Sequence, residues 1–446
     1  MKKEELSRIV NISIPSIGEI VLYTLISMFD IMLLGKSGGK LLVSAAGISN
    51  EILYTFSNII ISIGISVAIT SLIARCIGGN MIKEAEEYAT IGFFIGVIFS
   101  TLITIIFYSS SEKILIIAGI KNDVLRIGSI YLRLGSISIL FYMITSLVCS
   151  ILKGYGNTFI PFVIAAVITM FNLILDIILI FIRPYGIIGA AFAKIISQGI
   201  GVILAIFYIT RYSKIKMKMS YIATMNIKKL ENIIAFSIPC SLEEGATSIS
   251  RLLSNILIMH CGTAAYAANQ IANTVEAVAY MPAIGLGAAA TTLVGFKAGE
   301  KNYKRVKSYA DICTYISIGI SLCFSTLFFM KSEYLIHFFI GVGDKEVLKL
   351  GARCLKISTI EQSFLAIAFV YTGAMKGMGD AKTPFMISLV TSWCIRLPLM
   401  YYSVHIARMS VTYVWYITAF QWICDAVLTY SIFKEKCLSK NILYRF

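Results

Sequence analysis

Long apolar runs alternate with short polar stretches along almost the whole chain. A helix needs about 20 apolar residues to cross the hydrocarbon core of a bilayer. The longer connections, 36–50 and 331–353, are expected to include interfacial pieces. The pattern therefore predicts an all-α integral membrane protein with twelve transmembrane helices, at residues 9–34, 52–74, 89–109, 128–152, 159–182, 187–210, 233–259, 267–294, 311–330, 354–375, 384–404 and 412–433.

Composition agrees with a chain that lies mostly in lipid. Hydrophobic residues make up 58% and charged residues only 14%, with a mean hydropathy of +0.82. Soluble domains carry about 25% charged residues. The first apolar run follows no small-residue cleavage site, so it is interpreted as the first span. The ten cysteines are scattered without a C-x-x-C pair, which is typical of small buried hydrophobic residues.

Basic residues are unevenly divided between the two sets of loops. Twelve spans place both termini on one side, and the loops of that side hold 23 Lys and Arg against 12 on the other. Cytoplasmic loops carry the excess of Lys and Arg, so both termini are predicted to be cytoplasmic. The net charge of +15 then reflects these loops, and no nucleic-acid partner is expected. Six basic residues fall in 211–229, which is predicted to be a cytoplasmic linker.

The two halves of the chain repeat. IPSIGE at 14–19 matches IPCSLE at 238–243, and LKGYGNTFIPF at 152–162 matches MKGMGDAKTPF at 375–385. A third match relates 72–89 to 293–310, and all three offsets lie between 221 and 224. An even number of spans per half gives parallel repeats, between which transporters often bind substrate. We therefore predict a six-helix lobe at 1–210, a basic linker at 211–230 and a second six-helix lobe at 231–446.

Polar residues inside the first-half spans form one candidate site. Asn172 and Asp176 are four residues apart and share a face of the fifth span. Lys194 lies on the sixth span, and the short connection makes spans five and six an antiparallel hairpin. An ionisable residue at the helix centre costs about 2.5–3.5 kcal/mol on insertion scales, so such residues are functional candidates. The acid and the ammonium are predicted to be neighbours, with Asp30 near them; alternatively, Lys194 extends to the outer headgroups.

A second candidate site lies in the other half. Glu243, Thr247 and Arg251 form a stripe along the seventh span, with Glu276 and Arg396 as possible partners on spans eight and eleven. A structural salt-bridge network and a coupling or substrate site explain this pattern equally well.

Several motifs in order resemble the MATE (multidrug and toxic compound extrusion) family of prokaryotic transporters over nearly the whole chain. They are Pro15 and Pro239, FDIMLLG (29–35), LKGYGNTFIPF (152–162), FNLILD (171–176), GIIGAAFAKIISQ (186–198), AANQIA (267–272), MPAIGLGAAATTLVGFKAG (281–299) and WCIRLP (393–398). The resemblance implies two six-helix bundles around a central cleft that opens alternately to each side. It also implies export of organic, often cationic and aromatic, compounds in exchange for Na⁺ or H⁺.

The resemblance further implies a role for particular residues. Asp30, Asn172 and Asp176 match the cation site of sodium-coupled prokaryotic members, where a threonine on the sixth helix completes the ligand set. Here that position is Lys194. Hard cations take oxygen ligands, which an ammonium does not supply. A Na⁺ site at these three residues is thus possible, but the coupling ion stays open between H⁺ and Na⁺.

The resulting functional prediction is a cation-coupled antiporter in the cell membrane that exports small organic cations, as a monomer and without a cofactor. The alternative is a lipid-linked oligosaccharide flippase of the same superfamily. An enzyme is not expected, because the three histidines lie far apart in the sequence near span ends and no H-E-x-x-H, G-x-S-x-G or Walker motif occurs.

Overall fold

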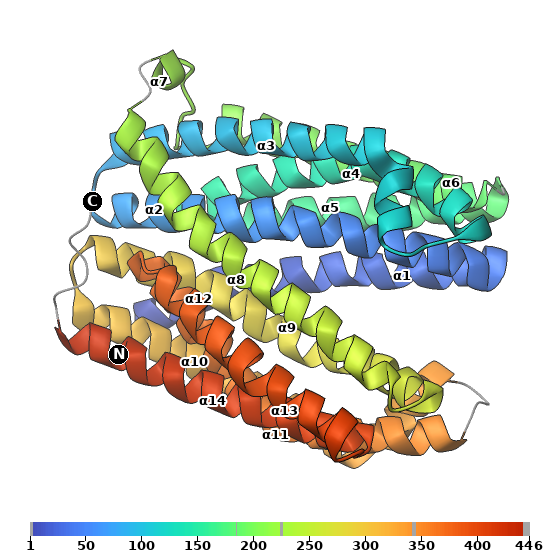
Figure 1. Ribbon diagram of the computed structural model, residues 1–446. Helices are drawn as coiled ribbons and strands as arrows, with labels where there is room; N and C mark the ends of the chain where they lie inside the picture. Colours follow the sequence, from blue (N-terminus) through green and yellow to red (C-terminus); the bar gives the residue numbers. More distant parts are fainter. Residues whose placement is uncertain (1–2, 184, 224–225, 341–344, 440–446) are drawn as a thin grey trace. The chain divides into compact units, whose positions relative to one another are not determined.

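The computed structural model describes residues 3–183, 185–223, 226–340 and 345–439, and within these ranges all regular structure is helical (Figure 1). The helices, with η marking π-helical turns, are α1 (Lys3–Ser57), η1 (Asn58–Ile65), α2 (Ser66–Gly78), α3 (Ile82–Ile117), α4 (Asn122–Gly154), α5 (Phe159–Asp176), η2 (Ile177–Ile182), α6 (Gly186–Arg211), α7 (Ser220–Ala223), α8 (Ile227–Met259), α9 (Thr263–Gly299), α10 (Tyr303–Ile340), α11 (Lys345–Met378), α12 (Lys382–Leu389), η3 (Val390–Arg396), α13 (Leu397–Tyr401), η4 (Tyr402–Ile406) and α14 (Val411–Ser439).

The predicted all-α membrane fold is confirmed. Among the described residues, ten helical stretches are long and apolar enough to cross a bilayer. The predicted spans 233–259 and 412–433 lie in α8 and α14, two further helices of 33 and 29 residues. The structure therefore contains ten to twelve helices suited to a membrane.

The 36–50 connection is helical, as part of α1. It contains no proline, whose ring would disrupt the helix. The helix nevertheless reverses there, because Asp30 and Asn50 both contact Lys194. A straight helix would separate these two residues by about 30 Å. The first two predicted spans therefore lie on the two sides of this reversal. The first lies in α1, and the second runs from the end of α1 through η1 into α2.

The internal repeat is visible in the backbone. α3 bends at Ser110 and α10 bends at Lys331, 221 positions later, each through one residue with non-helical dihedral angles. Gly156 and Gly379, 223 positions apart, have φ angles of 94° and 98°, in the region that favours glycine. The bend at Lys331 also ends the predicted span 311–330, so the interfacial piece expected after it begins at a kink.

Ion pairs repeat as well. In the first half, Lys153 Nζ lies 2.8 Å from Glu19 Oε1. In the second half, Lys376 Nζ lies 3.0 Å from Glu243 Oε2, and these two residues occupy the equivalent positions. Each pair joins the helix that opens its half to the end of the helix that carries the K-G motif.

The described chain packs as two compact units, Ile14–Ser241 and Met1–Ser13 together with Leu242–Phe446. α1 and α8 each contribute to both units, since the unit boundaries fall inside these helices. The predicted lobe boundaries, 1–210 and 231–446, were drawn from the repeat in the sequence and stay a prediction.

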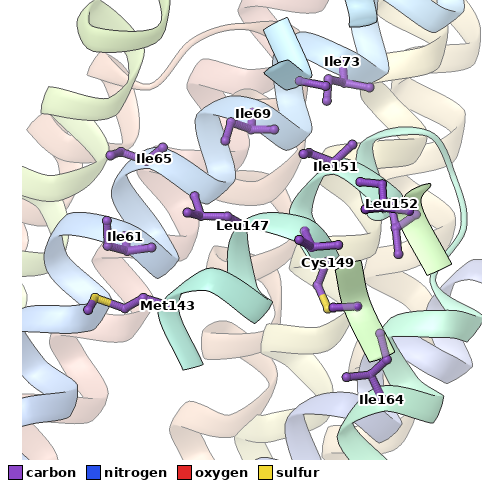
Figure 2. Close-up of a cluster of buried hydrophobic side chains, with 14 of the residues drawn as sticks. Ile61, Ile65, Ile69, Ile73, Met143, Leu147, Cys149, Ile151, Leu152 and Ile164 are labelled. Carbon is purple, nitrogen blue, oxygen red and sulfur yellow. The ribbon is translucent and has the colours of Figure 1, made fainter. Parts of the chain in front are cut away.

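The core of the unit Ile14–Ser241 includes a seam between α2 and α4, shown in Figure 2. Isoleucines at a spacing of four form one buried row on η1 and α2, and α4 supplies the facing side chains: Ile61, Ile65, Ile69, Ile73, Met143, Leu147 and Ile151. A Cβ on Gly154 would lie 2.9 Å from Ile73 Cβ and 3.0 Å from the Thr70 carbonyl oxygen. Glycine thus lets the two helices approach closely, as is common in membrane bundles.

The predicted linker is docked on the start of α3. The Lys216 backbone N–H donates to Glu86 Oε1 at 3.2 Å, and the Tyr221 hydroxyl donates to Glu86 Oε2 at 3.1 Å. Ile215 is fully buried in the unit's core. Figure 1 shows α7, which carries Tyr221, as a short turn beside the end of this helix. Residues 215–221 of the linker are therefore a strap held against the start of α3.

Candidate functional site

Three helices bring the predicted first-half residues together. Asp30 lies on α1, Asn172 and Asp176 on α5, and Lys194 on α6. All four side chains are at least nine-tenths buried, with exposed fractions of 0–5%. α5 ends at Asp176, and the π-helical turn η2 begins at the next residue. π-helical turns often mark functional sites in membrane and soluble helices alike.

Lys194 points into this cluster. Its Nζ lies 2.7 Å from Asp30 Oδ2, and its side chain is only 6% exposed. The ion pair is with Asp30, whereas the sequence predicted Asp176 as the neighbour of the ammonium and placed Asp30 only near by. Lys194 is buried in the cluster and does not extend to the outer headgroups.

Asn172 links the two acids. With its amide nitrogen turned toward them, it donates to Asp30 Oδ1 at 3.0 Å and to Asp176 Oδ2 at 3.2 Å. Asp176 Oδ1 is buried and has no hydrogen-bond partner among the described residues. The two carboxyl groups thus share the Asn172 amide, the ammonium pairs with Asp30, and one Asp176 oxygen stays without a hydrogen bond within the described part of the chain.

Three further residues complete the cluster and were not predicted. Lys194 Nζ donates to Asn50 Oδ1 at 3.2 Å, and the Tyr131 hydroxyl donates to the same oxygen at 3.3 Å. The ammonium also lies 5.9 Å from the ring centroids of Tyr54 and Tyr131, within cation–π range. A polar Asn50 close to an apolar run was an available signal, but nothing in the sequence distinguishes two tyrosines among 24.

The predicted second-half residues fall into two separate groups. In one, Gln362 Nε2 donates to Glu276 Oε1 at 2.8 Å, and Glu361, the residue before Gln362, is buried. Arg396 donates to Ser250 Oγ at 2.9 Å and lies near enough to Glu361 to interact electrostatically. Glu276 and Arg396 therefore belong to one buried polar network.

Glu243 and Arg251 lie outside that network's hydrogen bonds. Glu243 pairs with Lys376, and Arg251 is an exposed residue that donates to Ser248 Oγ at 3.4 Å. Residues eight positions apart on a helix share a face but are separated by about 12 Å along its axis. The stripe predicted on the seventh span therefore does not converge on one set of partners.

Donors already occupy the first-half cluster where a sodium ion would need oxygen ligands. The ammonium of Lys194 and the amide nitrogen of Asn172 both face the carboxylates. No group of three or more His, Cys, Asp or Glu side chains in the described part of the chain is arranged to hold a metal ion. With these donors in place, the cluster does not offer the set of oxygen ligands that a Na⁺ site at Asp30, Asn172 and Asp176 would need.

Two repeated halves of apolar helices, each with buried charged residues, define an integral membrane transporter. The family model MatE matches the chain twice, at residues 15–178 and 239–402, once in each half. The chain belongs to the MatE family of membrane efflux transporters, so the sequence-based family assignment is confirmed.

Similar proteins agree with this assignment. The chain is 25% identical over 423 residues to the "Probable multidrug resistance protein NorM" of Thermotoga maritima, covering 93% of this chain and 90% of that protein. It is also 25% identical to a protein of the same name from Agrobacterium fabrum, covering 87% and 84%. These relatives do not favour the flippase alternative.

Solved structures share the fold. A transporter of the MOP superfamily from Pyrococcus furiosus matches with a TM-score of 0.92 at 18% identity, covering 98% of this chain and 96% of that one. An outward-facing multidrug resistance MATE family transporter matches with the same TM-score, identity and coverage. At this identity the likeness shows the fold alone.

Proposed function

We propose that the protein is a proton-coupled antiporter that exports small organic cations, with Asp30, Asp176 and Lys194 as the coupling group. The observation that carries this proposal is a buried Lys194 ammonium paired with Asp30, with a second buried carboxyl group, Asp176, joined to the same cluster through Asn172. The relatives named as multidrug resistance proteins support an organic substrate.

Charge counting supports a proton as the coupling ion. With both acids ionised and Lys194 charged, the cluster has a net charge of −1, and one added proton makes it neutral. Burying net charge in a low-dielectric interior is costly, so the protonated, neutral cluster is the form that burial favours. Asp176 Oδ1, with no hydrogen-bond partner among the described residues, is the free acceptor position for that proton.

The same net charges explain why a proton would be exchanged for a cationic substrate. A cluster that has lost its proton has a net negative charge and attracts a cationic substrate. A protonated cluster is neutral and does not attract a cation electrostatically. Proton and substrate thus compete for one state of the protein, and competition at alternately exposed sites produces antiport. In the cell-membrane orientation that we propose, with both termini cytoplasmic, protons enter and organic cations leave.

The test is ethidium efflux from proteoliposomes that carry either a pH gradient alone or a Na⁺ gradient alone. We expect efflux driven by the pH gradient and none by Na⁺ at clamped pH. The Asp176→Asn variant should lose pH-driven efflux, whereas Asp123→Asn, an exposed acid in the first turn of α4, should keep it. Efflux driven equally well by Na⁺, or unchanged in Asp176→Asn, would refute proton coupling at this cluster.

A further inference from the structure

Two of the chain's three histidines meet at the surface of the second unit. His260 directly follows the end of α8, and His405 lies on η4. Their ring centroids are 4.8 Å apart with an interplanar angle of 64°. Both side chains are exposed, and both belong to the unit that contains Leu242–Phe446. Two imidazoles in contact on an open surface are a potential pair of metal ligands.

The tautomer of His260 is fixed in the form that binds metals. Its Nδ1 lies 3.0 Å from the backbone carbonyl oxygen of Ile256. A carbonyl oxygen only accepts hydrogen bonds, so Nδ1 carries the proton and Nε2 keeps its lone pair. A histidine that ligates a metal almost always donates its other ring N–H in this way. The backbone of α8 therefore prepares His260 as a ligand.

The spacing of the two rings suits one shared ion. Zinc is held by imidazole nitrogens at about 2.1 Å, which in tetrahedral geometry separates the two ring centroids by about 5 Å. The observed 4.8 Å needs little rearrangement. The Tyr401 ring centroid lies 4.9 Å from that of His405, so the tyrosine packs against the His405 ring.

We propose that His260 and His405 bind one divalent transition-metal ion, Zn²⁺, Ni²⁺ or Cu²⁺, and so join the end of α8 to η4. Imidazole suits these ions, whereas Mg²⁺ and Ca²⁺ prefer oxygen ligands. Among the described residues no third His, Cys, Asp or Glu completes the group. Water fills the remaining coordination positions, which makes the site an exchangeable one rather than a structural zinc centre.

The test is isothermal titration of Zn²⁺ into the full-length protein, purified in detergent with any histidine tag removed and chelator dialysed away. We expect one equivalent to bind, and His260→Ala and His405→Phe each to weaken binding by about tenfold or more. His405→Phe keeps an aromatic ring beside Tyr401, so its loss of binding reports the nitrogen rather than the packing. Mg²⁺ should give no binding at the same concentrations.

The chain supplies its own matched controls. His337→Ala removes the third histidine, an exposed residue near the end of α10, and should leave Zn²⁺ binding unchanged. Cys261→Ser removes the thiol next to His260 and should also leave it unchanged. Absence of Zn²⁺ binding to the unaltered protein would overturn the proposal, and so would equal binding by the His260→Ala and His337→Ala variants. Neither result depends on whether transport is proton-coupled.

Discussion

Lys194 and Asp176 share a cluster without sharing a salt bridge, because the Lys194 ammonium is paired with Asp30 at 2.7 Å and Asp176 is reached through the amide of Asn172. The two acids therefore have different tasks. Asp30 pairs with the ammonium, and under the proposed mechanism Asp176 is the acid that gains or loses a proton. Substitutions of Asp30 and of Asp176 should therefore have different effects on stability and on transport.

Replacing Asp30 should destabilise the fold. Asp30→Asn leaves the Lys194 ammonium without its buried partner, and breaking a buried pair in this way costs about 3–5 kcal/mol. Asp176→Asn removes no partner of an ammonium and keeps the hydrogen-bonding shape, so its cost should be below about 1 kcal/mol. Thermal unfolding in detergent, followed by tryptophan fluorescence, measures the difference. Equal melting temperatures for the two variants would show that the acids are interchangeable.

Lys194→Thr should make the cluster able to bind Na⁺. The change removes the tethered cation and supplies a hydroxyl oxygen beside Asp30 and Asp176, which suits a hard cation. We expect pH-driven ethidium efflux to fall and a Na⁺-dependent rise in melting temperature to appear. Lys194→Met is the matched control, since it removes the cation without adding an oxygen. Identical Na⁺ responses of the Thr and Met variants would count against a ligand role for the new oxygen.

The two repeated ion pairs should have similar energetic roles. Lys153→Met and Lys376→Met each leave a largely buried glutamate unpaired, at Glu19 and Glu243, so each should lower stability by about 3 kcal/mol. Adding Glu19→Gln to Lys153→Met should recover most of the loss, because no unpaired charge then remains. Double-mutant cycles on melting temperature provide the measurement. Additive effects within a pair would mean that the ion pair contributes nothing.

The linker strap should be released by a single substitution. Glu86 accepts hydrogen bonds from the Lys216 backbone and the Tyr221 hydroxyl, so Glu86→Ala frees the segment around several lysines. Trypsin should then cleave within 214–218 at least tenfold faster, because cleavage follows local opening and each 1.4 kcal/mol is a factor of about ten. Glu84→Ala, a half-buried acid on the same turn, is the control. Unchanged cleavage in Glu86→Ala would show that other contacts hold the linker.

Orientation can be tested on the same segment. Six basic residues in 211–229 predict that it is cytoplasmic. A cysteine at the exposed Ser220, in a variant without the ten native cysteines, should react with an impermeant maleimide only after the cells are permeabilised. Reaction in intact cells would reverse the proposed topology.

The helical spacing and the charges of the sequence predicted several residues of the first-half cluster. The four-residue spacing of Asn172 and Asp176, with a short turn before Lys194, was enough to predict that these residues gather, although the ammonium pairs with Asp30 rather than with Asp176. The partners Asn50 and Tyr131 were not predictable, because they arrive through the reversal of α1 and through α4, and no spacing in the sequence encodes that approach.

Contacts between the ends of spans were harder to predict for a different reason. Lys153 and Lys376 follow apolar runs and look like ordinary basic residues of cytoplasmic loops. In the structure, Lys153 pairs with the buried Glu19 and Lys376 pairs with the half-buried Glu243. Similarly, the partner of Glu276 is the neutral Gln362, so charge matching alone gave no reason to pair them.

The assignment of Met1–Ser13 to the unit of Leu242–Phe446, and of residues 227–241 to the other unit, has an evolutionary consequence. In a half-length ancestor with this packing, the start of the first helix would have had no surface of its own chain to pack against. Two copies would have supplied that place for each other, as in a domain-swapped homodimer. Gene duplication and fusion through a basic linker would then have made an exchange between subunits permanent within one polypeptide.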